Sequence, residues 1–434
     1  MKYKYFKPNF VFFLINTFFL NLLIYLFQFY QKKDEVNYYL CTSIYEYQIK
    51  IFSFNVEFIY PESCDLSTYQ QGVLNFTSFF NLSDYVYQDR PLFIFYIFIF
   101  YSLISLFFGM LLTDLWVLKF SFFLGQLFLT AFVSLFIYRI FILLDLRIAK
   151  NYLLFPLFIS LSPMYKWHIY ESTSMTFTML IFVYGIYIVL NENILNRSFI
   201  FIGLLFLVHR SAILILVFYI LYKIIISKVT FNLIYKFLYT TLPVVIYYLL
   251  VFIFSNFSDH QAQGYRQFIW IFDYLNGEET MNGGYFCQTP RDALLCYLRD
   301  VYNLINYLAA PSLFLIFFLI SKYKLMSEKL KKFIYISISF AFLINLFWLF
   351  IGWYPPIRFS YYGYGNLVIL LLIFSINMFK DPMAKTIFIS AFISYFLFLN
   401  HWNSPEVIFY SSYIKISFLL FFSSLVIENS KKST

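Results

Sequence analysis

Charged residues are scarce in this 434-residue chain, because Asp, Glu, Lys and Arg together make up only 12% of it. Soluble domains usually carry about 25% of these residues. Hydrophobic residues account for 62% of the chain, and the mean hydropathy is +0.73. This composition excludes an ordinary soluble globular domain and predicts a polytopic protein of the lipid bilayer.

Recognisable nucleotide-binding and hydrolase motifs are also missing. The chain has no Walker A sequence and no G-x-G-x-x-G, so ATP-driven transport and Rossmann-type donor binding have no support. It also lacks H-E-x-x-H and G-x-S-x-G, which removes the easily recognised hydrolases. No internal repeat is visible, which weakens the case for an inverted-repeat transporter.

Apolar runs suited to crossing about 30 Å of hydrocarbon recur along the chain. Each should be helical, because hydrocarbon offers no partner to unpaired backbone groups. We therefore expect an all-α bundle of about 11 to 13 transmembrane helices, whose first run is an uncleaved anchor. The expected spans are residues 9–30, 91–112, 115–144, 152–163, 174–190, 199–222, 233–257, 304–320, 333–353, 367–379, 386–400 and 407–427.

Basic residues predict the orientation. The lysines of segments 2–7, 322–332, 380–385 and 431–432 are expected on the cytoplasmic side of the cell inner membrane. The N-terminus is then cytoplasmic, and two large loops, 31–90 and 257–301, are periplasmic. The net charge of +9 is explained by this topology and gives no reason to expect a nucleic-acid partner.

One stretch conflicts with strict alternation of spans, which places Arg139, Arg147 and Lys150 outside, against the charge rule. Either that rule fails locally, or one apolar segment between residues 91 and 144 lies along the membrane interface without crossing. The choice also decides whether Glu171 faces outward.

The two large loops contain 14 of the 22 acidic residues and all four cysteines. In an oxidising periplasm we expect the disulfides Cys41–Cys64 and Cys287–Cys296. Carboxylates beside a membrane can accept a proton from an attacking hydroxyl, while basic groups hold a phosphate leaving group. This combination is typical of glycosyl transfer from a lipid-linked donor.

The order of residues in the first half resembles the GT-C glycosyltransferases. The segments that carry the resemblance are Asp65-Leu-Ser-Thr-Tyr69, Gln88-Asp-Arg-Pro-Leu92, Leu106-Phe-Phe-Gly109, Leu161-Ser-Pro163 and Gly203-Leu-Leu205 through His209-Arg-Ser211. They are most similar to the protein mannosyltransferase and aminoarabinose transferase type. The resemblance covers roughly residues 10–230, which predicts a core module of residues 1–230 and a variable module of residues 231–434.

The resemblance implies transfer of a sugar from a polyprenyl-phosphate carrier to a lipid, glycan or protein acceptor on the outer face. Asp65 would activate the acceptor, with Tyr69 and Arg90 beside it; the pair Asp34 and Glu35 is an alternative match. A second acidic residue of the family binds a divalent metal or the acceptor, and Glu171 is the candidate for it if it faces outward. No other cofactor is implied.

Basic and aromatic residues near the predicted membrane surface are candidates for substrate binding. Arg358 and Tyr361 lie at a predicted outer helix end, and His209 and Arg210 interrupt an apolar run, where ionisable residues are functional candidates by default. O-antigen and exopolysaccharide polymerases also combine an early Asp-x-x-x-Tyr with stretches like residues 209–212 and 358–361. A polymerase is therefore an alternative, and a non-enzymatic flippase or transporter is a second one.

Overall fold

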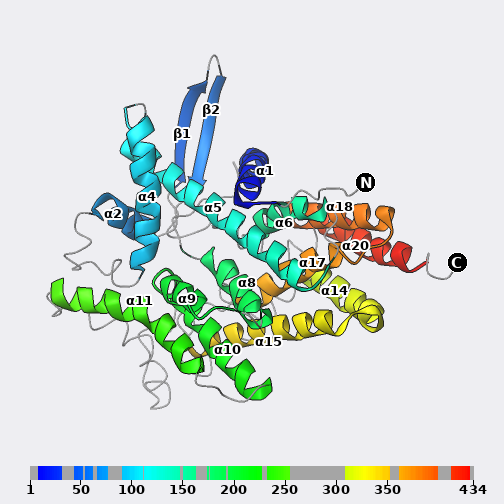
Figure 1. The fold of residues 1–434 in the computed structure, drawn as a ribbon. Coiled ribbons are helices and arrows are strands. Elements are labelled where there is room, and N and C mark those ends of the chain that lie inside the picture. Colours follow the sequence, from blue (N-terminus) through cyan, green and yellow to red (C-terminus); the bar gives the residue numbers. More distant parts are fainter. Residues whose placement is uncertain are drawn as a thin grey trace, which may run out of the picture.

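The computed structural model describes residues 8–31, 44–51, 54–61, 66–76, 90–110, 112–146, 150–162, 174, 176–191, 194–226, 232–254, 308–351, 361–398 and 412–430. Helices form almost all of this part of the chain (Figure 1). The α-helices are α1 (Phe10–Gln31), α2 (Leu66–Leu74), α4 (Pro91–Phe108), α5 (Asp114–Leu143), α6 (Phe155–Leu161), α8 (Phe177–Leu190), α9 (Ser198–Phe206), α10 (Ile213–Ile226), α11 (Asn232–Phe254), α14 (Ala309–Lys322), α15 (Glu328–Ile351), α17 (Asn366–Ile376), α18 (Pro382–Phe398) and α20 (Ser412–Ser430). Short helical turns are η3 (Lys150–Leu154), η4 (Arg210–Ala212), η5 (Tyr323–Leu325) and the π-helical η6 (Tyr361–Gly365).

The all-α prediction holds for these helices, but the first large loop contains a β-hairpin. Strands β1 (Ile44–Ile51) and β2 (Phe54–Pro61) pair antiparallel, from Ile44 opposite Pro61 to Ile51 opposite Phe54. The sequence Ile-Tyr-Glu-Tyr-Gln-Ile-Lys-Ile is rich in β-branched and aromatic residues and alternates polar with apolar over part of its length, which favours a strand. A search for long apolar runs misses this signal.

Each expected apolar run corresponds to helix, although the run 199–222 is broken. It divides into α9, η4 and α10, and His209 between them has an extended backbone. Within the described residues, four helices are long and apolar enough to cross a membrane, namely Pro91–Phe108, Trp116–Leu143, Asn232–Leu250 and Glu328–Phe347. Five shorter apolar helices accompany them. The described part of the chain therefore suits a bilayer environment.

Local sequence explains several helix starts. The side-chain oxygen of Asn9 accepts the Phe12 backbone N–H at 2.9 Å at the beginning of α1, and Asp381 accepts that of Ala384 at 2.9 Å at the beginning of α18. Such N-caps satisfy backbone donors that a helix leaves without a partner. Pro91 begins α4, because proline has no N–H to lose in a first turn.

Aromatic side chains dominate one continuous core that draws on both halves of the chain. The rings of Phe158 and Phe392 stack with centroids 3.9 Å apart, and those of Phe182 and Phe340 lie 5.7 Å apart and nearly parallel. Gly203 lets α9 approach the backbone of α11, where an added Cβ would collide with the Thr240 carbonyl. Close approach through a small residue is typical of helices packed in membranes.

Lysines from several helices gather on one face, which we call the basic face and define by Lys322, Lys329, Lys332 and Lys385. Lys329 pairs with Asp145 beyond the end of α5 at 2.5 Å, Lys385 binds Asn151 of η3, and Lys332 lies over the ring of Tyr222 in α10. Lys322 pairs with Glu428 of α20 at 2.5 Å. These contacts bring widely separated segments of the chain to the same face.

The contact of Lys329 with Asp145 bears on the conflict about residues 139–150. Strict alternation of spans separates these residues from the 322–332 segment, whereas the structure places Asp145 beside Lys329. The end of α5 and the start of α15 therefore lie on the same side of the molecule, which the charge rule favours and strict alternation does not. Asn151, next to Lys150, likewise contacts Lys385.

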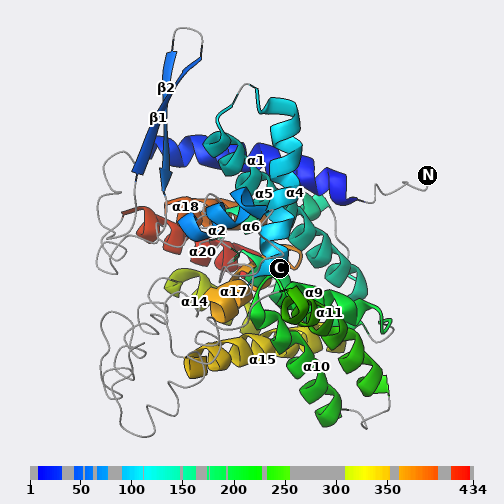
Figure 2. The same ribbon diagram turned by 90° about the vertical axis from the view of Figure 1, so that its left-hand side faces the viewer.

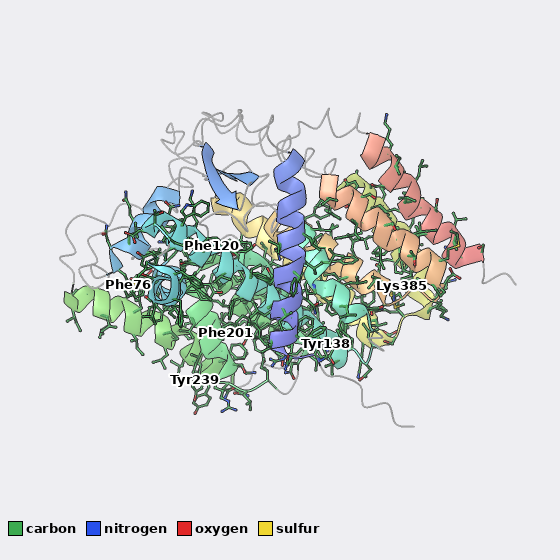
Figure 3. The ribbon with its side chains drawn as sticks, turned by 90° about the horizontal axis from the view of Figure 1, so that it is seen from above. Phe76, Phe120, Tyr138, Phe201, Tyr239 and Lys385 are labelled. Atoms are coloured by element: carbon green, nitrogen blue, oxygen red, sulfur yellow. The ribbon has the colours of Figure 1, made fainter. Side chains whose placement is uncertain are left out.

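Helix α4 lies crosswise to other long helices. It stands upright in Figures 1 and 2, whereas α15 runs across the page in both. Helix α1 also runs across the page in Figure 2. Viewed from above, Phe76 beside α4 and Lys385 of the basic face lie at opposite sides of the molecule (Figure 3).

Candidate functional site

Arg90 is the centre of a polar group at the start of α4. It precedes Pro91, and its backbone carbonyl accepts the N–H groups of Phe93 and Ile94 at 3.1 and 3.3 Å. Its Nη1 atom donates to the Oγ atom of the buried Ser174 at 2.6 Å. A cation at a helix N-terminus opposes the helix dipole, so this position gains from a nearby anion.

Tyr69 supports the Arg90 guanidinium from α2. The Cζ atom of Arg90 lies 5.5 Å from the centroid of the Tyr69 ring, within the range of a cation–π contact. Tyr69 is nearly buried and meets Phe93 edge to face at 5.5 Å. The guanidinium is thereby held between an aromatic ring and a hydroxyl, which restricts its orientation.

His209 and Arg210 reach the same place from the turn between α9 and α10. The Leu92 backbone N–H donates to the Leu207 carbonyl at 3.2 Å, which joins the first turn of α4 to this turn. Because α9 and α10 meet through Phe199 and Tyr219 at 5.0 Å, they form an antiparallel pair with His209 and Arg210 at its tip.

The environment of His209 selects the neutral imidazole. His209 is buried in the connection between α9 and η4, outside the candidate spans. Burial lowers the pKa of its imidazole well below the ordinary value of 6.5, and the positive charges of Arg90 and Arg210 lower it further. Its Nδ1 accepts the Ser211 N–H at 3.4 Å and contacts the Ser211 hydroxyl at 2.7 Å, so the proton is assigned to Nε2.

We refer to Tyr69, Arg90, Ser174, His209, Arg210 and Ser211 as the Arg90 cluster. All four predicted site residues whose side chains the structure describes, Tyr69, Arg90, His209 and Arg210, belong to it. They come from three separate segments of the chain. Two of the cluster's six members, Arg90 and Arg210, carry a guanidinium, a group that can bind an anionic ligand such as a phosphate.

A second layer of polar groups lies behind the cluster, and sequence reasoning missed it. The Thr176 hydroxyl donates to the Oε1 atom of Gln126, which is buried in α5. Lys119 is buried in the same helix with 3% of its surface exposed. Lys119 and Gln126 are seven residues apart, about two turns, so they share a helix face with Phe122, whose ring meets Phe93 at 6.1 Å. The signal that the sequence offered for this layer was the pair of polar residues two helical turns apart in an otherwise apolar run.

The structure does not describe the side chains of the remaining predicted site residues. Asp34, Glu35, Asp65, Glu171, Arg358 and the four cysteines Cys41, Cys64, Cys287 and Cys296 lie outside the described residues. The Tyr361 backbone begins η6, which packs against α15 where Gly363 adjoins Asn345. Among the described residues, no three His, Cys, Asp or Glu side chains gather as they would around a metal ion.

Comparisons with family models, curated proteins and solved structures give no match to this chain.

Proposed function

We propose that the chain is a polytopic glycosyltransferase of the cell inner membrane, with a GT-C-like bundle of about 11 to 13 spanning helices. Its N-terminus is cytoplasmic, and its two large loops are periplasmic. It moves a sugar from a polyprenyl-phosphate carrier to a lipid, glycan or protein acceptor. The observation that carries the proposal is the convergence of Tyr69, Arg90 and His209 at one end of the bundle.

The Arg90 cluster would hold the donor phosphate. Sugar transfer breaks the bond between the anomeric carbon and a phosphate oxygen, so negative charge develops on the departing polyprenyl phosphate. A fixed guanidinium stabilises that charge, and Ser174 and Tyr69 fix the Arg90 guanidinium before the ligand binds. The neutral His209 can donate a hydrogen bond from Nε2.

Asp65 is proposed to take the proton from the acceptor hydroxyl as that oxygen attacks the sugar. Asp34 or Glu35 would take this role if the alternative match is the correct one, and Glu171 would bind the acceptor or a divalent metal. In the Asp65→Asn variant the general base is lost, and transfer is expected to fall to background. Retained transfer would exclude Asp65 as the base.

The direct test of the phosphate site compares Arg90→Ala and Arg90→Lys with Arg197→Ala. Arg197 is a matched control, because it also precedes a helix but is exposed. Membranes containing each variant are incubated with radiolabelled polyprenyl-phosphate sugars, and release of polyprenyl phosphate is measured. Loss of a charged hydrogen bond costs about 1.5–3 kcal/mol, so Arg90→Ala should release product roughly 10- to 100-fold more slowly. Equal rates for Arg90→Ala and Arg197→Ala would overturn the proposal.

A polysaccharide polymerase is the second candidate, because the stretch His209 to Ala212 forms the tip that meets Arg90. A polymerase would lengthen a glycan and release polyprenyl diphosphate instead of polyprenyl phosphate. Chromatography of the released lipid in the same assay separates the two reactions.

A further inference from the structure

Helix α4 has the composition of a transmembrane span, but its contacts do not fit one. It contains 18 residues without a charge, so it is about 27 Å long and apolar throughout. A span at this point would form a hairpin with α5, because only residues 109–113 connect the two helices.

The contacts between α4 and α5 exclude such a hairpin. In an antiparallel hairpin, residues nearer the end of α4 meet residues nearer the start of α5. Instead, Phe93 contacts Phe122 at 6.1 Å, whereas Phe100, two turns later, contacts Phe128 at 5.0 Å. Residues later in α4 therefore contact residues later in α5, which is the reverse of the order of contacts in a hairpin.

A parallel arrangement is excluded by the length of the connection. It would carry Phe108 to the level of about residue 136, roughly 33 Å along α5 from Asp114. Six residue steps span at most about 20 Å. Helix α4 must therefore cross α5 steeply, as Figures 1 and 2 show.

The crossing lies in the part of α5 that is remote from the basic face. Asp145, beyond the end of α5, contacts Lys329 of that face, whereas Phe122 is about 34 Å back along the helix. Helix α8 runs alongside α5. Its Phe177 ring contacts the ring of Phe93 at the start of α4, and its Tyr187 ring contacts the ring of Phe136 in α5. Phe136 is nearer the basic face than Phe122 is. Ser174 and the start of α4 therefore lie at the end of the bundle that is remote from the basic face.

One side of α4 is packed and the other is an exposed apolar stripe. Phe95, Ile99, Leu103 and Leu106 follow one another at intervals of three or four residues and are all exposed. Such a stripe on a helix that does not cross suits burial in lipid along the surface of the bilayer. Lipid is the occupant that the composition favours, because the helix has no charged residue with which to recognise a protein partner and its exposed side is mainly apolar.

We infer that α4 is an interfacial helix, lying in the plane of the membrane at the end of the bundle opposite the basic face, with this stripe in the outer-leaflet lipid. Helix α5 then begins outside and ends at the cytoplasm, which places Arg139 and Lys150 where the charge rule expects them. Arg90, at the start of α4, lies at the depth of lipid headgroups. The inference is independent of the proposed reaction.

Spin labels on the stripe test the orientation directly. Single cysteines at Phe95, Ile99, Leu103 and Leu106 are labelled in the reconstituted full chain, and their accessibility to oxygen and to a nickel chelate is measured. If α4 is interfacial, the ratio of oxygen to nickel accessibility should be about the same at all four positions, because all four lie at one depth. If α4 is a span, the ratio should rise to a maximum at the positions nearest the bilayer centre. The exposed stripe of α11, Ile234, Leu238, Val245 and Leu249, is the control that should show this maximum. A maximum along α4, or low oxygen access throughout, would overturn the inference.

Labelling in intact cells tests the same inference from the turn after α4. Thr113 and Leu325 are both exposed, and each is replaced by cysteine and treated with a membrane-impermeant maleimide. The native chain gives the background. Thr113→Cys should react in intact cells, and Leu325→Cys only after the cells are opened. Reaction of Thr113→Cys only in opened cells would mean that α4 crosses the membrane.

Discussion

The Nζ atom of Lys329 lies 2.5 Å from the Oδ2 atom of Asp145, although 184 residues separate them in the chain. Both side chains are exposed, at 63% and 73%, so the pair contributes little to stability, about 0–1 kcal/mol. Its importance is geometric, because it joins the end of α5 to the first turn of α15.

Crosslinking tests this geometry. The double variant Asp145→Cys with Lys329→Cys should form a crosslink with a short bis-maleimide, detected by altered migration after proteolysis between the two sites. The pair Thr113→Cys with Lys329→Cys should not, because Thr113 is at the other end of α5. Crosslinking of the second pair alone would contradict the arrangement of α5.

Glu428 is predicted to be a main support of the basic face. Its carboxylate accepts from Lys322 at 2.5 Å and from the backbone N–H groups of Asp381 and Lys380 at 3.0 and 3.2 Å, and the ion pair is buried. Removing one partner of a buried pair costs about 3–5 kcal/mol. Glu428→Gln should therefore clearly lower the melting temperature in detergent. The surface pair Glu328–Lys331 is the control, and Glu328→Gln should change the melting temperature little.

The same contact predicts a pH dependence. Burial alone would raise the pKa of the Glu428 carboxyl, but the hydrogen bonds from Lys322 and the two backbone donors outweigh it, so the pKa is lower than the ordinary 4.5. A carboxyl with a lowered pKa stabilises the fold fully above its ordinary pKa, and this contribution is lost as the pH falls through the lowered value. Melting temperatures from pH 7 to 3 should thus fall more for the native chain than for Glu428→Gln. Parallel curves would refute the role of Glu428.

Gly203 is predicted to determine how closely α9 packs on α11. A methyl group there would meet the Thr240 carbonyl and Pro243, so Gly203→Ala should force the helices apart and cost about 1–3 kcal/mol. Leu204→Ala is the neighbouring control on the exposed side. Thermal unfolding compares the two, and a larger loss for Leu204→Ala would count against this packing.

Ser174 is predicted to position Arg90 without itself contacting the substrate. Ser174→Ala removes the acceptor of the 2.6 Å hydrogen bond and should reduce turnover in the polyprenyl-phosphate assay about tenfold, while Ser174→Thr restores it. Ser337→Ala is the control, because the hydroxyl of that buried serine donates to a carbonyl of its own helix, that of Phe333. Equal activity of Ser174→Ala and the native chain would show that Arg90 does not need this contact.

Part of the candidate site could be predicted from the sequence. Arg90, His209 and Arg210 are noticeable because charges are rare in apolar surroundings, where each has a high cost unless it has a role. Ser174 and Thr176 give no such signal, since single hydroxyls are common in apolar helices and bond to their own backbone. Only the packing of α8 against α4 and α5 identifies them.

The sequence by itself determined which segments are helical and apolar, because hydropathy and run length follow directly from local composition. It also determined which lysines are expected on the same side of the membrane. The tertiary structure decided the direction of α4 and the meeting of Leu92 with Leu207, because both depend on contacts between residues far apart in the chain. A uniformly apolar helix such as α4 has the same composition whether it crosses a bilayer or lies along it, and its neighbours make the difference.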